Sequence, residues 1–129
     1  NASATIALTM VENPSAYGLV EVASDGKVLK FLEKPSAGDI DRSNVKTVNA
    51  GIYILQPEIL RYVPEGENFS FEYELFPRLL ESGENFRAFV ATGSYWLDIG
   101  TPERYLQAHQ DLMKGKIKNF QVRGNRNFK

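Results

Sequence analysis

The sequence has 129 residues, a length that fits one domain burying roughly two-thirds of the surface of its unfolded chain. Its 43% hydrophobic content is typical of a globular protein, and the lack of cysteine excludes a disulfide framework and a thiolate metal site. We find no apolar run long enough to span a bilayer and no secretory signal pattern, so we expect a soluble, cytoplasmic protein.

Charge is distributed unevenly along the chain. The net charge is −1, but the last 16 residues hold six basic side chains and no acidic one, so the rest of the chain carries −7. The six are Lys114, Lys116, Lys118, Arg123, Arg126 and Lys129. A basic tail can bind polyanions, but such tails are more often only solvated. Because Phe120 and Phe128 are its only aromatic residues, we do not expect nucleic-acid binding.

The first half of the chain predicts strands joined by turns. Residues 4–10 and 17–23 are apolar strand candidates, and residues 28–33 return antiparallel to the second of them. Asp25-Gly26 is a hairpin signal, because this dipeptide accepts the positive φ angles of a type I′ turn. Residues 36–47 are polar and aperiodic and predict a loop. Residues 48–55 predict an apolar strand that is buried on both faces.

Helix signals dominate the second half. Pro57 suits the first turn of a short helix, and Ser70 is a candidate cap for a helix that runs to about residue 82 and is kinked by Pro77. Residues 86–90 and 95–99 are further strand candidates. Thr101 caps a last helix, which ends near Met113. This mixture predicts an α/β (α+β) fold on one layer of sheet.

Glu33 and Lys34 end the strand predicted over residues 28–33. We expect Pro35 to hold Lys34 in an extended conformation. A carboxylate at this place can accept hydrogen bonds from sugar hydroxyls, and an ammonium can hold a phosphate as a point charge. The alternative interpretation is an exposed ion pair at a strand terminus.

Asn49 and Gly18 are two further candidates. The Asn49 amide offers a donor and an acceptor together, which suits vicinal hydroxyls, although an asparagine can also bond its own turn. Gly18 lies in a strand, where glycine marks either the close approach of a ligand or a bulge.

Asp98 is the candidate metal ligand. It lies between two apolar residues, where an unpaired charge is costly and a metal ion would offset the cost. Magnesium prefers carboxylates together with substrate phosphates. The alternative is a carboxylate that bonds the helix start at Thr101. His109 is interpreted as structural, because no partner carboxylate or nucleophile is placed beside it.

Three motifs together resemble a known family. Glu33-Lys34-Pro35, Asn49-Ala50-Gly51 and the run WLDIGTPERY over residues 96–105 resemble, in this order, the second half of the sugar nucleotidyltransferases. These enzymes join a sugar 1-phosphate to a nucleoside triphosphate; the mannose-1-phosphate guanylyltransferase and glucose-1-phosphate thymidylyltransferase groups look most similar. The resemblance implies that residues 1–115 form the C-terminal half of a nucleotidyltransferase domain, a mixed sheet with flanking helices, followed by a basic tail over residues 116–129.

The resemblance also assigns roles to the candidate residues. The Gly18 backbone, Glu33 and Asn49 would contact the sugar, Lys34 would hold the sugar phosphate, and Asp98 would be one of two aspartates that hold catalytic magnesium. Nothing in the sequence matches the family's Gly-rich loop and its following Arg and Lys, which hold the triphosphate. Because this chemistry relies on positioning and charge stabilisation, we expect weak sugar 1-phosphate binding and no activity by the chain alone.

Two alternatives stay open. One is that the chain is one half of an active enzyme that another chain completes, and the other is that it is a non-catalytic binding or regulatory module. In either case the absence of the nucleotide-binding half would leave an exposed sheet edge and an apolar face. We therefore expect self-association, with a symmetric homodimer as the commonest solution.

Overall fold

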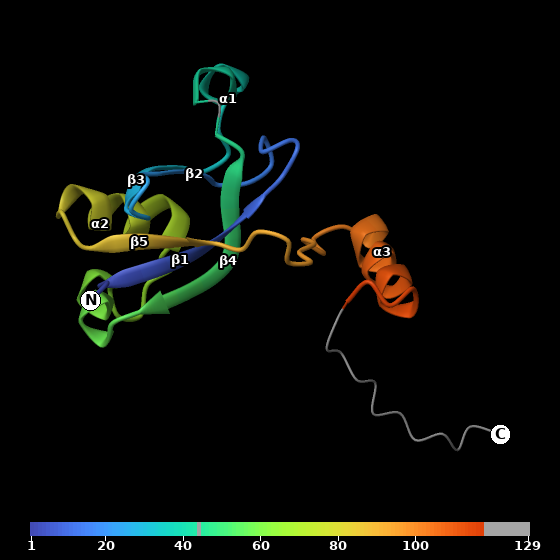
Figure 1. The fold of residues 1–129 in the computed structure, drawn as a ribbon. Helices are drawn as coiled ribbons and strands as arrows, with labels where there is room; N and C mark the ends of the chain where they lie inside the picture. Colours follow the sequence, from blue (N-terminus) through green and yellow to red (C-terminus); the bar gives the residue numbers. More distant parts are fainter. Residues whose placement is uncertain (44, 118–129) are drawn as a thin grey trace. The chain divides into compact units, whose positions relative to one another are not determined.

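The structure is a computed structural model that describes residues 1–43 and 45–117 (Figure 1). It divides into two compact units, Asn1–Thr92 and Gly93–Lys129. From residue 118 onward, the predicted basic tail lies outside the described residues.

The first unit is built on a five-stranded mixed sheet, which confirms the predicted fold class. Its strand order is β3-β2-β4-β1-β5, and its strands pair antiparallel except for β1 and β5, which are parallel. The strands are β1 (Ala4–Met10), β2 (Leu19–Val22), β3 (Val28–Leu32), β4 (Thr47–Leu55) and β5 (Phe86–Val90). All of them overlap strands predicted from the sequence.

The hairpin between β2 and β3 differs from the predicted type I′ turn. Only Gly26 has a positive φ, 86°, whereas type I′ needs two such residues. The amide of Gly26 donates to the carbonyl of Ala23 at 2.9 Å, and the pairing register shifts between Glu21 and Val22. These features are typical of a longer hairpin loop in which one glycine takes the left-handed conformation.

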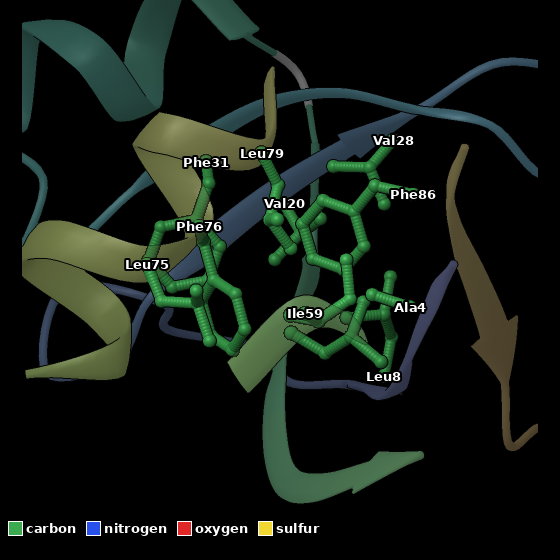
Figure 2. Close-up of a cluster of buried hydrophobic side chains, with 11 residues drawn as sticks. Ala4, Leu8, Val20, Val28, Phe31, Ile59, Leu75, Phe76, Leu79 and Phe86 are labelled. Atoms are coloured by element: carbon green, nitrogen blue, oxygen red, sulfur yellow. The ribbon is translucent and has the colours of Figure 1, made fainter. Parts of the chain in front are cut away.

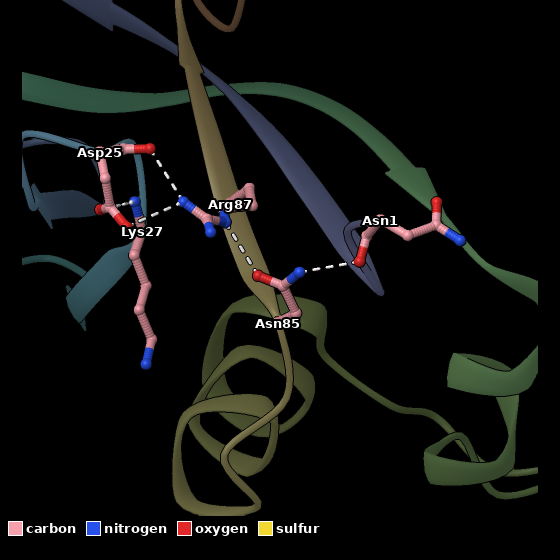
Figure 3. Close-up of polar contacts among 5 residues, drawn as sticks. All are labelled: Asn1, Asp25, Lys27, Asn85 and Arg87. Carbon is pink, nitrogen blue, oxygen red and sulfur yellow. Dashed lines mark hydrogen bonds and ion pairs between the residues drawn. The ribbon is translucent and has the colours of Figure 1, made fainter.

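The tip of this hairpin bonds to β5, at the other edge of the sheet (Figure 3). Arg87 donates to the carbonyl of Asp25 at 2.8 Å and pairs with its carboxylate at 3.1 Å, while the amide of Ala88 donates to the carbonyl of Gly26 at 2.8 Å. Asn85 accepts from Arg87 Nε at 2.8 Å and so fixes the guanidinium. The sheet therefore curls far enough for the hairpin tip to contact β5, where Lys27 and Arg87 form an isolated bridge.

A short helix, α1 (Ala37–Ser43), lies where the sequence predicted a loop. Ser36 and Asp39 cap it reciprocally: the Ser36 hydroxyl accepts from the Asp39 amide at 3.3 Å, and the Asp39 carboxylate accepts from the Ser36 amide at 3.1 Å. This pair is a capping box, which starts a helix without any apolar periodicity. Periodicity alone could not reveal it.

The remaining helices of the first unit are η1 (Pro57–Tyr62), η2 (Phe71–Leu75) and α2 (Phe76–Glu81). Ser70 caps η2 as predicted, since its hydroxyl accepts from the amide of Tyr73 at 3.2 Å. The backbone changes from the π-helical turn of η2 to the α-helix α2 at Phe76. Pro77 thus falls in the first turn of α2, where the missing amide costs nothing.

The core is organised around Phe76, which is fully buried (Figure 2). Its ring lies 5.0 Å from Phe31, 5.1 Å from Tyr53 and 5.3 Å from Phe86, measured between ring centroids. Burying a side chain of this size stabilises the fold by roughly 1.5–3 kcal/mol. The cluster joins α2 to strands β3, β4 and β5, and so it fixes the positions of the strands that carry the candidate site.

The outer face of the sheet carries apolar side chains. Tyr53 and Leu55 of β4 pack against the core, but the alternate residues Ile52 and Ile54 are 61% and 74% exposed. Phe89 on β5 is 64% exposed. The prediction that β4 is buried on both faces is therefore wrong, because strand residues alternate and the core covers one face only.

The second unit holds α3 (Pro102–Met113). Thr101 caps this helix as predicted, and its hydroxyl accepts from the amide of Arg104 at 3.3 Å. Residues 95–99 form no strand, contrary to expectation. Within the described ranges, no helix combines the length and the apolar character needed to cross a membrane.

Candidate functional site

Gly18, just before β2, and Glu33, just after β3, come together with Asn49 of β4. A methyl group on Gly18 would lie 2.7 Å from Oε2 of Glu33 and 3.5 Å from Cβ of Asn49. It would also lie 2.8 Å from the ring of Phe31, and the carbonyl of Gly18 accepts from the amide of Asn49 at 2.9 Å. A residue without a side chain is therefore required here, so that the Glu33 carboxylate can approach the backbone of Gly18.

The surroundings of Glu33 disfavour the ionised form of its carboxylate. Burial raises the pKa of Glu33 above its ordinary value, the charge of Glu72 raises it further, and Lys34 lowers it. A carboxylate in this state gains from neutral donors that bind it without adding charge. Sugar hydroxyls are donors of this kind.

Lys34 is exposed at the bend that follows β3, and its backbone is strained. Its φ is 47°, and it is the one non-glycine residue with positive φ in the described parts of the chain. The prediction of an extended Lys34 is therefore wrong. Pro35 disfavours the right-handed helical region for the preceding residue, and the bend after β3 takes the left-handed region instead. That region costs a non-glycine residue roughly 1–2 kcal/mol.

The amide of Asn49 is bonded at both of its ends. Its Oδ1 accepts from the amide of Gly51 at 2.9 Å, and its Nδ2 donates to the hydroxyl of Tyr53 at 2.7 Å. The first bond is the local turn that the sequence left open as an alternative. One N–H and one lone pair of the amide are left for other partners.

Sequence reasoning missed Tyr53 and Glu72. Tyr53 donates to Oε1 of Glu72 at 3.0 Å, which brings the start of η2 to the site. Tyr53 could have been found, since residues 49, 51 and 53 of one strand share a face. Glu72 gives no such signal, because its approach depends on how η2 packs against the sheet.

Asp98 lies in the second unit and is paired there. Its Oδ2 forms an ion pair with Arg104 at 2.7 Å, and its Oδ1 accepts from the amide of Gly100 at 3.1 Å. In the described residues no cluster of three or more His, Cys, Asp or Glu side chains could hold a metal ion. These residues therefore do not form a magnesium site by themselves, and the role of Asp98 as a ligand stays a prediction.

Asp111 is a second acidic residue of this unit, and no pattern in the sequence had singled it out. It is only 5% exposed and accepts from Tyr95 at 3.1 Å, Gln107 at 2.8 Å and Lys116 at 2.8 Å. The hydrogen bond from Lys116 is the main cause of the lowered pKa of Asp111. Asp111 thus ties the segments on either side of α3 to the helix. His109 is exposed, and its Nδ1 lies 2.9 Å from the carbonyl of Tyr105.

Comparison with known proteins places this arrangement in a family. Residues 1–115 match the family described as nucleotidyl transferase. The chain is 38% identical over 110 residues to a UTP–glucose-1-phosphate uridylyltransferase of Synechocystis sp.. The aligned segment covers 85% of this chain and 27% of the relative. It is 34% identical over 125 residues to a mannose-1-phosphate guanylyltransferase of Mycobacterium tuberculosis, covering 97% of this chain and 33% of the relative.

The fold agrees with these matches. The crystal structure of HddC from Yersinia pseudotuberculosis superposes with a TM-score of 0.65 at 30% identity, over 87% of this chain and 45% of HddC. The chain therefore spans about a third or less of the two curated relatives and about half of HddC. The match over residues 1–115 and the shared fold show that the chain belongs to the nucleotidyl transferase family, among the sugar nucleotidyltransferases.

Proposed function

We propose that the chain supplies the sugar 1-phosphate side of a nucleotidyltransferase site, with the nucleotide side coming from outside these 129 residues. The observation that carries the proposal is the convergence of Gly18, Glu33 and Asn49, because it places an acceptor carboxylate and an amide beside an open backbone. Carboxylates and amides of this kind bind the hydroxyls of a sugar.

Lys34 adds the charge that a phosphate requires. It directly follows Glu33, and its charge acts on the Glu33 carboxylate. We assign the phosphate to Lys34 and the sugar hydroxyls to Glu33, Asn49 and the Gly18 amide. With half of the enclosing wall supplied from elsewhere, we expect binding by the chain alone to be weak.

Asp98 would supply one carboxylate to magnesium in a completed site. The metal would lower the charge repulsion between phosphate groups, and its other ligands would be phosphate oxygens and groups from outside this chain. Because Arg104 pairs with Oδ2 of Asp98 at 2.7 Å, its guanidinium would compete with the cation for that carboxylate.

Two measurements on the purified chain test this proposal. In the first, mannose 1-phosphate with GTP, and glucose 1-phosphate with UTP, are incubated with magnesium and the release of pyrophosphate is followed. We expect no release above that of the matched Asp98→Ala variant. Steady release by the unaltered chain alone would refute the proposed division of the site.

The second measurement is an NMR titration with mannose 1-phosphate and with inorganic phosphate. Lys34→Ala should weaken the binding of both, whereas Glu33→Ala should weaken mannose 1-phosphate and leave phosphate unaffected. Equal affinities of the unaltered chain for the two compounds would show that the site does not recognise a sugar.

The exposed outer face favours a second candidate, in which a separate chain binds this one and completes an active enzyme. Ile52, Ile54 and Phe89 form an uncovered apolar face, and such faces mark interfaces. We would add the N-terminal part of the mycobacterial relative, up to the start of the matched segment, to the purified chain. Magnesium-dependent pyrophosphate release that needs both pieces would support this candidate, and its absence would leave the binding half-site as the function.

A further inference from the structure

The ring of Tyr53 is fixed by the core, and its hydroxyl reaches the candidate site. The ring lies 5.1 Å from Phe76 in an edge-on arrangement and 6.0 Å from Phe71. Contacts of this kind leave an aromatic side chain little freedom. The position of the hydroxyl beside Asn49 is therefore set by the same packing that holds β4 against α2.

The hydrogen bonds of this hydroxyl have a defined direction. An ionised carboxylate can only accept, so Tyr53 donates its proton to Glu72 at 3.0 Å and must accept from Nδ2 of Asn49 at 2.7 Å. Burial raises the pKa of Tyr53 to about 12, so the hydroxyl keeps its proton at neutral pH. Glu72 is itself held, since its Oε2 accepts from the hydroxyl of Ser70 at 3.3 Å.

We propose that Tyr53 and Glu72 are positioning residues that hold the Asn49 amide in one orientation, so that the site presents a fixed N–H donor beside the Glu33 carboxylate. This inference rests on the proposed sugar 1-phosphate site and identifies the feature of the ligand that the site recognises, which is a pair of neighbouring hydroxyls. Neighbouring sugar hydroxyls can meet both groups at once, because one donates to Glu33 while the next accepts from Asn49. Inorganic phosphate lacks these sugar hydroxyls, so in this arrangement it makes neither the bond to Glu33 nor the bond from Asn49.

Two isosteric variants test the role of these residues. Tyr53→Phe keeps the ring packing and removes the hydroxyl. Glu72→Gln keeps the shape but introduces an amide donor, which allows the Tyr53 hydroxyl to reverse its direction. The matched control is Tyr62→Phe, because the Tyr62 hydroxyl likewise donates to a glutamate, Glu84, at 3.0 Å while accepting from Arg61 at 3.2 Å.

The first readout is the side-chain NH2 group of Asn49 in ¹⁵N NMR spectra of the full chain without ligand. We expect slow hydrogen exchange for the proton bonded to Tyr53, and exchange at least tenfold faster in Tyr53→Phe and Glu72→Gln but not in Tyr62→Phe. Unchanged exchange in both site variants would overturn the proposal, whatever the chain binds.

The second readout is the ratio of the Kd for inorganic phosphate to the Kd for mannose 1-phosphate. Loss of an oriented hydrogen bond in each site variant should reduce this ratio about tenfold, with phosphate binding unchanged. A ratio that stays at the value of the unaltered chain would overturn the proposal. If the unaltered chain does not distinguish the two compounds, the proposed function fails, while the NH2 exchange still decides whether Tyr53 and Glu72 position Asn49.

Discussion

Replacing the strained lysine of the candidate site separates its backbone from its charge. Lys34→Ala and Lys34→Gly both remove the ammonium, but only glycine adopts the φ of 47° without strain. We expect both variants to lose phosphate affinity to the same extent. We also expect Lys34→Gly to be the more stable of the two. At most positions the alanine variant is more stable than the glycine variant.

The size of the reversal follows from the backbone angle. A left-handed conformation destabilises the alanine variant by roughly 1–2 kcal/mol. Glycine avoids this cost, but the greater conformational freedom of its unfolded chain destabilises the glycine variant by about 0.4–1 kcal/mol. The net advantage of glycine over alanine is about 0.5–1 kcal/mol, or a few degrees in Tm for a domain of this size. At an ordinary strand position alanine is instead the more stable by roughly 0.5–1 kcal/mol.

Urea denaturation of the two variants measures this difference. The matched control is the pair Lys30→Ala and Lys30→Gly on β3, where the side chain is also exposed and the backbone has no positive φ. We expect opposite signs at the two positions. If glycine is less stable than alanine at position 34 as well, the strain argument is refuted.

Three further predictions concern the site and the outer face. In Gly18→Ala the added methyl group would lie 2.7 Å from the Glu33 carboxylate. We expect urea denaturation to show a loss of about 1–3 kcal/mol, and unchanged stability would contradict the close approach. The raised pKa of Glu33 means that its stabilising contribution is complete at acid pH and is lost as the pH rises through the folded-state pKa, so Glu33→Gln should be more stable than the unaltered chain at pH 7 and equal to it near pH 3. A gain that is the same at both pH values would count against this assignment. Light scattering should give a dimer or larger species at micromolar concentration and a smaller one for Ile54→Lys, and a monomer mass for the unaltered chain would exclude the expected self-association.

Features that depend on a few neighbouring residues were predictable from the sequence. The caps at Ser70 and Thr101 are bonds between a side chain and an amide three residues away, so the local sequence determines them. The strands of the first unit follow from apolar runs bounded by turn residues. The convergence of Gly18 with Glu33 and Asn49 was predictable because each lies at the end or the start of a predicted strand, where α/β folds bind ligands. The roles given to these residues came from the family resemblance.

The features that were missed depend on tertiary structure. Glu72 enters the site only because η2 packs beside β4, and no local pattern records that packing. Lys34 departs from the extended conformation because the chain must turn directly after β3. The prediction that β4 is buried on both faces was wrong, because an apolar sequence shows that a strand favours burial on both faces. It does not show whether the described residues pack against both of them. Ile52 and Ile54 stay exposed for this reason.

The bridge between the hairpin tip and β5 also bears on how the chain reaches its fold. Strand β5 pairs with β1, with Ala4 opposite Phe86, and its Arg87 pairs with Lys27, so both contacts join distant parts of the sequence. Contacts of this range make folding slow, on a timescale of roughly milliseconds to seconds, because a long loop must close before they form. During synthesis β1 has no parallel partner until β5 leaves the ribosome. We therefore expect β2, β3 and β4 to assemble earlier, before the sheet closes, and to bring together Gly18, Glu33 and Asn49, which lie at or beside the ends of these strands.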